Sequence, residues 1–429
     1  MEEKLELKLN EEQIAHMKVG AQIIEHFSKG IYNNPSNSIR ELINNSYDAD
    51  ATKLTIRARP EFDTFTIIDN GSGMDYDDFN NKFLWISRSD KRDNDTLSPM
   101  FKRPLIGFIG IGFIAVSQIC NKMTVISSKE NQPFKFEAVI DFSKFKKTEH
   151  KKKDFYELSE VKFINLPEEK NAHYTIIILN ELTKEFKDYL MDKDRGEAIE
   201  IKSFSFIGLK FEEIIERINY LIRDPKFDLS KNIGRYWNLL LDLAMSLPVK
   251  YLDEGPIKIL NKEAVESNLD VIEKIKSDVN DLNFKVDFDG IVLKKPILFP
   301  NEEDIQESNL DFNVFSISKK FIFDDKSELE FVGYIYNQRR MIYPPQYRGL
   351  IIRIKNVSIG GPVPDFLEYL YGEKQFLNWT FGEIYIKQGL ESAMNIDRSS
   401  FIITHEHYRC LRKYIHDTLH NEIIPKCRE

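Results

Sequence analysis

Apolar residues along the chain follow two different spacings, which predict strands in some regions and helices in others. The segments LTIRARP and FTIIDN, which begin at Leu54 and Phe65, are short and rich in β-branched and aromatic residues, as strands are. Between about residues 206 and 262, FEEIIERINYLI and YWNLLLDLAM place apolar residues at helical spacing. Beyond them, FKVDFDGIVL, LEFVGYIYN and GLIIRIKNVSIG again indicate strands. The pattern predicts a mixed α/β fold.

The order of these elements also predicts how the chain is divided. Helices over about Glu11–Lys29 and Asn37–Tyr47 share the first half with strands, which indicates an α/β sandwich with a mainly antiparallel sheet covered by helices on one face. The final segment HEHYRCLRKYIHDTLHNEII is a further helix candidate. We therefore expect four parts: a first domain over residues 1–205, a helical connector over 206–262, a second α/β domain over 263–400 and a helical tail over 401–429.

The first segment that carries candidate chemistry is RELINNSYDADA, which begins at Arg40. It places Glu41, Asn45 and Asp48 at relative positions 0, 4 and 7, and the helical period brings all three to one stripe of a helix. One helix face thus carries two carboxylates and a carboxamide. Such a polar face is in most helices simply solvated, so this segment alone does not define a site.

The second segment is FTIIDNGSGM, a strand that ends in a glycine-containing turn. The apolar run Phe65–Ile68 leads to Asp69, and Gly71 and Gly73 permit positive φ angles and a close approach of the backbone. A flat ring can then lie against the main chain. An ordinary turn between two strands is the alternative.

The third segment is IGFIGIGF, which begins at Ile106. Its glycines precede the apolar run Phe113–Ile119, so free backbone N–H groups at a helix start can face anionic oxygens. The order is GxxGxG, which differs from the GxGxxG of dinucleotide sites, and a glycine turn before a helix is often only structural. The combination of all three segments, in this order and spacing, favours a nucleotide site.

The three segments together resemble the motifs of the GHKL ATPases, the superfamily of gyrase, the ninety-kilodalton heat-shock chaperones, histidine kinases and MutL. The resemblance implies that Glu41 is the general base for the attacking water, that Asn45 holds Mg²⁺ against the phosphates of ATP, and that Asp69 contacts the adenine amino group. The glycine loop would close over the phosphates as the end of a mobile lid. The resemblance assigns these further residues to the nucleotide site: Asp48, Gly71, Gly73, Met74, Gly107, Gly110, Ile111, Gly112, Phe113 and Thr175.

The assignment of Thr175 rests on a fourth element of the superfamily, a threonine on a late strand that supports the adenine-binding aspartate. The segment AHYTIIILNEL supplies this threonine. The superfamily commonly has glycine directly before it, whereas Tyr174 stands here.

The residue types also suit phosphoryl transfer by themselves. This reaction needs positioning and charge neutralisation more than covalent assistance, so one metal ligand, one water-orienting carboxylate and a set of N–H donors suffice. Mg²⁺ is commonly held by one or two protein oxygens together with phosphates and waters. The chain has no GxxxxGK[ST] motif, which argues against a P-loop NTPase.

The second half of the chain resembles the middle domain of the ninety-kilodalton heat-shock chaperones, such as HtpG. In those chaperones an Asn-x-x-Arg stretch after a strand and loop lends an arginine to the γ-phosphate, and Asn395 and Arg398 match it. The resemblance implies that Arg398 senses ATP and contributes to catalysis. Ile402 stands where the chaperones have glutamine. A surface salt bridge is the alternative role for Arg398.

Composition and charge agree with a cytoplasmic enzyme. The 429 residues suffice for two or three domains, and 42% hydrophobic with 30% charged residues is typical of a globular protein. There is no run of eighteen or more apolar residues, and the three cysteines are too few for a disulfide framework. A net charge of -9 argues against a general nucleic-acid binder, and a lysine-rich run over residues 144–153 favours a solvated loop.

A metal site is a further possibility in the last helix. His416 and His420 are four residues apart, which can place two ligands on one helix face. No CxxC or HExxH motif accompanies them, and histidine is common near helix C-termini.

Two functions remain open for such an ATPase. In the first, ATP-dependent lid closure and homodimerisation make it a chaperone-like or effector-regulating switch that acts on a client or effector protein. In the second, the same closure forms a DNA clamp like MutL or the MORC proteins. The second-half resemblance and the acidic charge favour the first, and no membrane partner is expected. An inactive nucleotide-binding scaffold is disfavoured because Glu41 is present.

Overall fold

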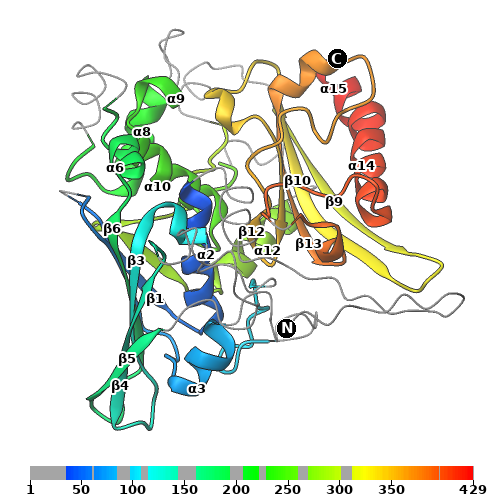
Figure 1. The fold of residues 1–429 in the computed structure, drawn as a ribbon. Helices are drawn as coiled ribbons and strands as arrows, with labels where there is room; N and C mark the ends of the chain where they lie inside the picture. Colours follow the sequence, from blue (N-terminus) through cyan, green and yellow to red (C-terminus); the bar gives the residue numbers. More distant parts are fainter. Residues whose placement is uncertain are drawn as a thin grey trace, which may run out of the picture.

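The computed structural model of the chain describes residues 35–59, 62–84, 97–107, 115–143, 161–193, 206–221, 229–258, 269–300, 312–395 and 397–428. Two β-sheets with their associated helices dominate it (Figure 1). The expected helix over Glu11–Lys29 lies outside the described residues.

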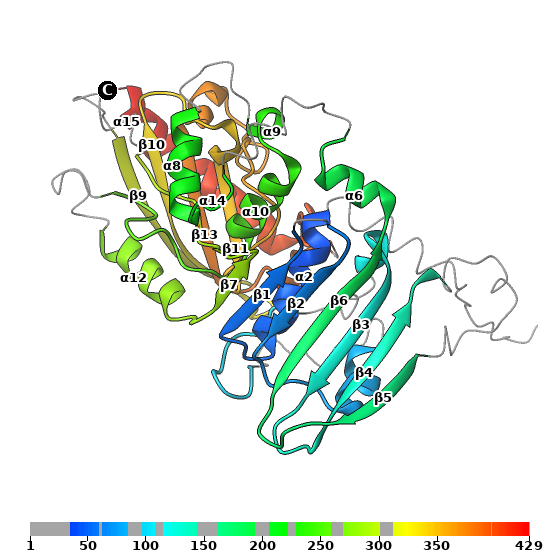
Figure 2. The same ribbon diagram turned by 90° about the vertical axis from the view of Figure 1, so that its left-hand side faces the viewer.

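The first sheet is large and mainly antiparallel (Figure 2). The exception is β1, which pairs in parallel with β7 so that Leu54 lies opposite Val286. All other neighbouring strands in this sheet are antiparallel. The spatial order is β5 (Lys162–Pro167), β4 (Phe134–Asp141), β3 (Cys120–Ser128), β6 (Tyr174–Leu182), β2 (Phe65–Asp69), β1 (Lys53–Arg57), β7 (Lys285–Phe288) and β8 (Ile291–Val292).

Helices cover one face of this sheet. Strand β2 shows why, because its period of two buries Ile67 while it leaves Ile68 38% exposed on the other face. The buried side joins one hydrophobic core with helices that include α2 (Pro35–Asp48), α8 (Phe211–Leu221) and α10 (Arg235–Ser246). The expected α/β sandwich with helices on one face is confirmed, as are the helices expected within 211–222 and 236–245.

Helix α2 begins at Pro35 and ends at Asp48, close to the expected bounds. Proline suits a first helical turn because its missing N–H would have no partner there. At the other end, Ala51 N–H donates to Ser46 O and Asp50 N–H donates to Tyr47 O. This is the hydrogen-bond pattern of a Schellman motif, and Asp50 takes the left-handed conformation that the motif requires, with φ of 61°.

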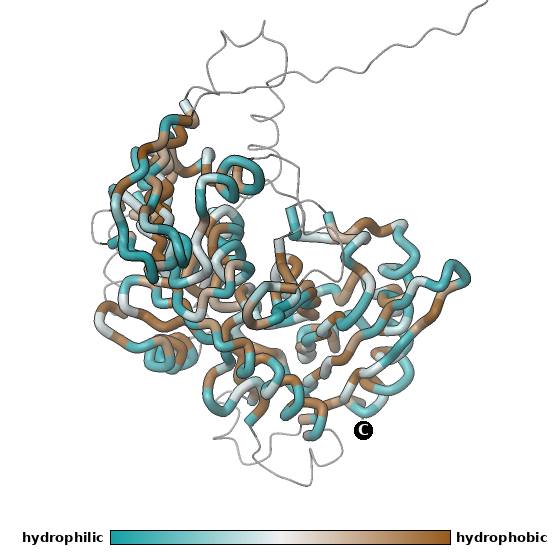
Figure 3. The backbone as a smooth tube through the Cα atoms, turned by 90° about the horizontal axis from the view of Figure 1, so that it is seen from below, coloured by the Kyte–Doolittle hydropathy of each residue, from teal (hydrophilic) through white to brown (hydrophobic). Residues whose placement is uncertain are grey.

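The second sheet is covered on both faces. In β11, Leu350 and Ile352 pack into the core with α14 (Glu406–Thr418), whereas Ile351 packs into the core with α12 (Leu269–Asn280). Figure 3 shows stretches of hydrophobic residues running through the interior of the tube, with hydrophilic residues at many of the outer bends. The strand order is β12 (Val357–Ser358), β11 (Gly349–Ile354), β13 (Thr380–Gln388), β10 (Glu328–Gln338) and β9 (Phe312–Ile322).

Apart from α14, the remaining described elements are short. The expected C-terminal helix is present as α14, followed by a π-helical turn η8 (Leu419–Ile423) and α15 (Ile424–Arg428). In the apolar run after the glycine loop, Ala115 is helical and a 3₁₀ turn, η3 (Val116–Gln118), follows it. Residues 108–114 lie outside the described residues, so the helix expected there stays a prediction. The others are α3 (Tyr76–Asp78), η1 (Phe79–Phe83), α6 (Lys184–Leu190), α9 (Leu229–Asn232), η5 (Pro345–Tyr347), η6 (Lys374–Trp379) and η7 (Glu391–Ala393).

Strand pairing crosses one expected domain boundary. Strands β7 and β8 follow residue 262 in the sequence, yet they belong to the first sheet because β7 adds to β1. The four-part division of the chain stays a prediction, and this pairing links its first and third parts through hydrogen bonds.

A buried polar cluster ties helix α10 to the second sheet. Arg353 donates to a Glu383 oxygen at 2.6 Å and also to the carbonyl of Met245, near the end of α10, at 2.9 Å. The other Glu383 oxygen accepts from Tyr251 and Tyr334 at 2.6 Å each. Because a buried charge must be paired and hydrogen-bonded to be tolerated, this cluster fixes where the helix end meets the strands.

Candidate functional site

Helix α2 presents the three predicted polar residues toward one region of the molecule. Glu41 and Asp48 are buried at 7% and 6% exposure, and Asn45 between them is half-buried. Burial of two carboxylates contradicts the simple solvated face that the sequence left open, because a solvated face would be exposed. The helix instead faces the segment around Ile106 and a loop from the second sheet.

The residue of the second sheet that reaches helix α2 is Arg398. Its Nη1 lies 3.6 Å from Glu41 Oε1, and both side chains are almost fully buried. Its Nη2 donates to the carbonyl of Ile106 at 2.7 Å, across 292 positions in the sequence. The structure therefore brings Glu41 and Arg398 together, and Arg398 is not in an exposed salt bridge.

The loop that carries Arg398 is held by its own backbone. Arg398 N–H donates to Asn395 O at 3.0 Å, and Asn395 Nδ2 donates to Ser400 Oγ at 2.7 Å. The Arg398 carbonyl accepts from Gly360 N–H at 3.0 Å, next to β12. Arg398 itself has φ of 52°, an unfavourable conformation for a residue with a side chain. Such strain is typical of residues that a functional site holds in place.

Asp48 binds the backbone at Ile106 through two successive N–H groups. Its Oδ1 accepts from Ile106 N–H and its Oδ2 accepts from Gly107 N–H, both at 2.7 Å. Asp48 thus contacts the start of the glycine-rich segment directly. Its expected contact with nucleotide stays a prediction.

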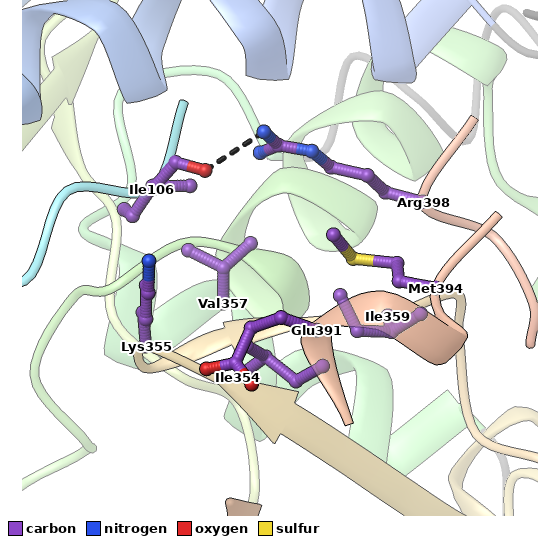
Figure 4. Close-up of a pocket in the computed structure, with 8 residues that line it drawn as sticks. All are labelled: Ile106, Ile354, Lys355, Val357, Ile359, Glu391, Met394 and Arg398. Atoms are coloured by element: carbon purple, nitrogen blue, oxygen red, sulfur yellow. Dashed lines mark hydrogen bonds between the residues drawn. The ribbon is translucent and has the colours of Figure 1, made fainter. Parts of the chain in front are cut away.

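A small pocket lies beside this junction (Figure 4). Arg398 and Ile106 form one wall, with their hydrogen bond drawn as a dashed line, and Glu391 comes from the short helix η7. Burial raises the pKa of the Glu391 carboxyl, although Lys355 nearby opposes this. The residues around the pocket are Ile106, Ile354, Lys355, Val357, Ile359, Glu391, Met394 and Arg398.

The predicted adenine-binding residue, Asp69, lies at the end of β2 with 4% exposure. One of its oxygens accepts from Ser46 Oγ at 2.7 Å and the other from Gly71 N–H at 2.9 Å. Burial raises the pKa of the Asp69 carboxyl, and the hydrogen bonds from Ser46 and Gly71 oppose that rise. The carboxylate is thus fixed in direction by α2 and by its own turn.

The turn after Asp69 needs its two glycines. A Cβ on Gly71 would lie 2.6 Å from the carbonyl oxygen of Ala49, and one on Gly73 would lie 1.8 Å from that of Ser128. Gly73 also has φ of +66°. The turn therefore packs its bare backbone against α2 on one side and β3 on the other, as the glycine pattern predicted.

Thr175 lies opposite Asp69 in the β2–β6 pairing and is buried. Its hydroxyl is 3.0 Å from Ser127 Oγ, which in turn accepts from Met74 N–H at 2.8 Å. Thr175, Met74 and the glycine turn are thus joined by one hydrogen-bonded group. The unusual Tyr174 does not enter it with its side chain, because its hydroxyl donates to Glu168 instead.

The sequence interpretation missed several residues of this region. Ser46 binds Asp69, Ser127 binds Met74 just after the glycine turn, and His173 Nδ1 lies 2.8 Å from the carbonyl of Gly71. The one sequence signal for Ser46 was its position directly after Asn45 in the helix that carries the first motif. Ser127 belongs to no motif, and His173 lies in the segment quoted for Thr175 without a role of its own. The pairing of β6 with β3 and with β2 brings them to the turn.

The other predicted residues lie either outside the described part of the chain or away from this site. Gly110, Ile111, Gly112 and Phe113, and the lysine-rich run over 144–153, lie outside the described residues. His416 Nε2 is 2.8 Å from the carbonyl of Phe366, and His420 Nδ1 is 3.5 Å from Glu373. No cluster of three His, Cys, Asp or Glu side chains suited to a metal occurs in the part of the chain that the structure describes.

The residues on α2 fit a magnesium nucleotide. Glu41 Oε1 is buried and accepts no hydrogen bond within the described residues, so a water or a ligand there would satisfy it. Asn45 offers the kind of oxygen that Mg²⁺ accepts, and a single protein ligand suffices when phosphates and waters supply the rest.

Comparison with known proteins agrees with this geometry. Residues 32–175 match the family model of "Histidine kinase-, DNA gyrase B-, and HSP90-like ATPase". The resemblance to GHKL-type ATPases is thereby confirmed over that part of the chain, and it supports ATP binding and hydrolysis at the level of the family.

Individual relatives are more distant. The chain is 38% identical over 114 residues to a putative type II restriction enzyme, HgiDII, of Herpetosiphon aurantiacus, covering 26% of this chain and 18% of that protein. It is 28% identical over 205 residues to the chaperone protein HtpG of Sulfurovum sp., covering 43% and 30%. HtpG of Campylobacter jejuni is 30% identical over 129 residues, covering 25% and 21%. The matched parts thus span less than a third of each relative's length. Among the described residues, no helix has the length and apolar character needed to cross a bilayer.

The geometry of Asp69 generates a prediction for nucleotide binding. Asp69→Asn replaces one of the two acceptor oxygens by an NH2 group, which then faces either the N–H of Gly71 or the O–H of Ser46. We expect ATP and ADP affinity to fall at least about tenfold, measured by titration calorimetry, since a site built to accept a hydrogen bond loses its acceptor. The exposed Asp63→Asn serves as the control. Unchanged affinity in Asp69→Asn would exclude the adenine role.

Proposed function

We propose that the chain is a magnesium-dependent ATPase in which the loop of the second sheet responds to the γ-phosphate of ATP. The observation that carries this proposal is the 3.6 Å approach of Arg398 to Glu41. A cation from one sheet system and the predicted general base from another meet at the start of the glycine-rich segment. Such an arrangement makes hydrolysis depend on how the two parts of the chain sit together.

Each side chain has a distinct task in this proposal. Glu41 orients and deprotonates the attacking water, for which a buried carboxylate with an unsatisfied oxygen is suited. Arg398 neutralises charge that develops on the γ-phosphate, as cations do in phosphoryl transfer. Asp69 accepts from the adenine amino group, and Asn45 holds Mg²⁺, which neutralises phosphate charge when it is bound.

The ion pair also suggests what ATP changes. Without the γ-phosphate, Arg398 neutralises Glu41 and holds the Ile106 carbonyl. With ATP, the phosphate competes for Arg398 and leaves Glu41 to the water. Lid closure and homodimerisation would follow from this exchange, and the protein would act as a chaperone-like or effector-regulating switch on a client or effector protein. The distant similarity to HtpG favours that reading.

The cytoplasmic location that the sequence predicts stays part of this proposal. Dimerisation can be followed by measuring the molecular mass with ADP and with a non-hydrolysable ATP analogue. A larger mass only with the analogue is the expected result.

The first prediction from the proposed function concerns the general base. Glu41→Ala removes the water-orienting carboxylate, so we expect turnover to fall at least about 100-fold. Affinity for ATP, measured by calorimetry, should stay within about threefold because the adenine contacts are unchanged. Glu216→Ala, at an exposed position on α8, is the control. A variant that retains full turnover would contradict the assignment.

The second prediction concerns Arg398. Arg398→Ala should slow ATP hydrolysis at least about tenfold, since a cation that stabilises transferring phosphate is lost. Affinity for ADP should hardly change because ADP lacks the γ-phosphate. Arg412→Ala, which removes a surface partner of Glu368, is the matched control. An unaltered rate would show that the second sheet does not act on the γ-phosphate through this residue.

A DNA clamp is the second candidate function, favoured by the similarity to a putative type II restriction enzyme. Under this alternative, double-stranded DNA should raise ATP turnover several-fold, and the rise should fall steeply with salt because phosphate contacts release counterions. If DNA does not change the rate of ATP turnover at any salt concentration from about 50 to 200 mM, the DNA clamp is excluded and the chaperone-like function remains.

A further inference from the structure

Asp50 has a backbone conformation that is unfavourable for a residue with a side chain. It is the residue in left-handed conformation that ends the Schellman motif of α2, with φ of 61°. Glycine usually takes this position, because a Cβ there is strained. Asp50 is also 3% exposed, so its charge has little contact with water. A buried aspartate where glycine is preferred points to a task for the carboxylate itself.

The Asp50 carboxylate binds the backbone of another segment. Its Oδ2 accepts from Met100 N–H at 2.7 Å and its Oδ1 accepts from Phe101 N–H at 3.3 Å. Asp48 does the same with Ile106 and Gly107. Two carboxylates at the end of α2 therefore each take two consecutive N–H groups from the segment over residues 97–107.

These carboxylates lie at an electrostatically unfavourable end of the helix. The C-terminus of a helix carries partial negative charge, which repels anions. The segment supplies a compensating cation, Arg103, whose Nη1 donates to the carbonyls of Tyr47 at 3.2 Å and Ala51 at 2.7 Å. The end of α2 supplies the two carboxylates and the segment over 97–107 supplies the arginine. These charges therefore compensate one another only when the segment is packed on the helix end.

Arg103 also connects this arrangement to the strand that crosses the expected domain boundary. Its Nη2 donates to the carbonyls of Leu282 at 2.9 Å and Asn283 at 3.2 Å, just before β7. Residues 97–107 are consequently held at Asp50, at Arg103 and at Asp48. The last of these points is the Ile106 peptide that Arg398 also binds.

We propose that Asp50 is a positioning residue that fixes the segment over 97–107 on helix α2, so that Ile106 stays between Asp48 and Arg398. The inference rests on the proposed ATPase function for its effect on turnover. Its effect on the segment does not depend on that function. Asp50 acts through the backbone of Met100 and Phe101 and has no contact with nucleotide in this proposal.

The test compares Asp50→Gly, Asp50→Asn and wild type. Asp50→Gly suits the left-handed conformation better and removes the carboxylate. It therefore distinguishes the role of Asp50 in ending the helix from its role in anchoring the segment. Asp50→Asn keeps one acceptor oxygen. The control is Lys326→Gly, which relieves a left-handed residue with φ of 66° in the exposed turn between β9 and β10.

Two readouts apply: hydrogen exchange of the peptide over 97–107 measured by mass spectrometry without nucleotide, and kcat with KM for ATP. We expect exchange at this peptide to be at least about tenfold faster in Asp50→Gly, with Asp50→Asn between it and wild type. We expect kcat to fall several-fold in Asp50→Gly while ADP affinity stays unchanged. Lys326→Gly should change neither readout.

Unchanged exchange over 97–107 in Asp50→Gly would overturn the proposal, and a gain in stability with unchanged exchange would show that Asp50 only ends the helix. Faster exchange with unchanged kcat in an active enzyme would overturn its role in positioning Ile106 for catalysis. A wild type without turnover would contradict the ATPase function, and the exchange result would still decide whether Asp50 anchors the segment.

Discussion

The peptide group between Ile106 and Gly107 is held from both sides by oppositely charged side chains. Asp48 accepts from the N–H of Gly107 and Arg398 donates to the carbonyl of Ile106, each at 2.7 Å. Breaking either hydrogen bond would cost free energy that water could not restore, because both side chains are buried. The start of the glycine-rich segment can therefore take this position only when α2 and the loop after β13 are both in place. The candidate nucleotide site depends on that constraint.

Two further connections keep those parts in place. The Arg353–Glu383 pair joins the end of α10 to the second sheet, and α10 shares a hydrophobic core with α2. The parallel pairing of β7 with β1 adds chain from beyond the connector to the first sheet. The candidate nucleotide site is thus joined to the second sheet by packed and hydrogen-bonded elements, through which the proposed response to ATP would pass.

Much of the fold was predictable because its elements have strong local patterns. Helix α2 was expected within two residues of its bounds, and glycines at 71 and 73 were expected to allow close backbone approach. The partners of these residues were not predictable. Ser127 reaches the turn after Asp69 because β3 pairs with β6, and His173 reaches it because β6 pairs with β2. Asp50 was assigned no role, and no local pattern could assign one, since its two N–H partners lie about fifty positions further along the chain.

By itself the sequence determined the periodicity of helices and strands, the order of the three motifs and the identity of the chemical groups on α2. These are local properties, set by backbone geometry and by spacing within one turn or one strand. The tertiary structure decided that Glu41 is buried against Arg398, that Asp48 and Asp50 bind backbone and that β7 joins the first sheet. Such contacts depend on how distant surfaces pack, and no spacing along the chain encodes which distant donor will meet a given carboxylate.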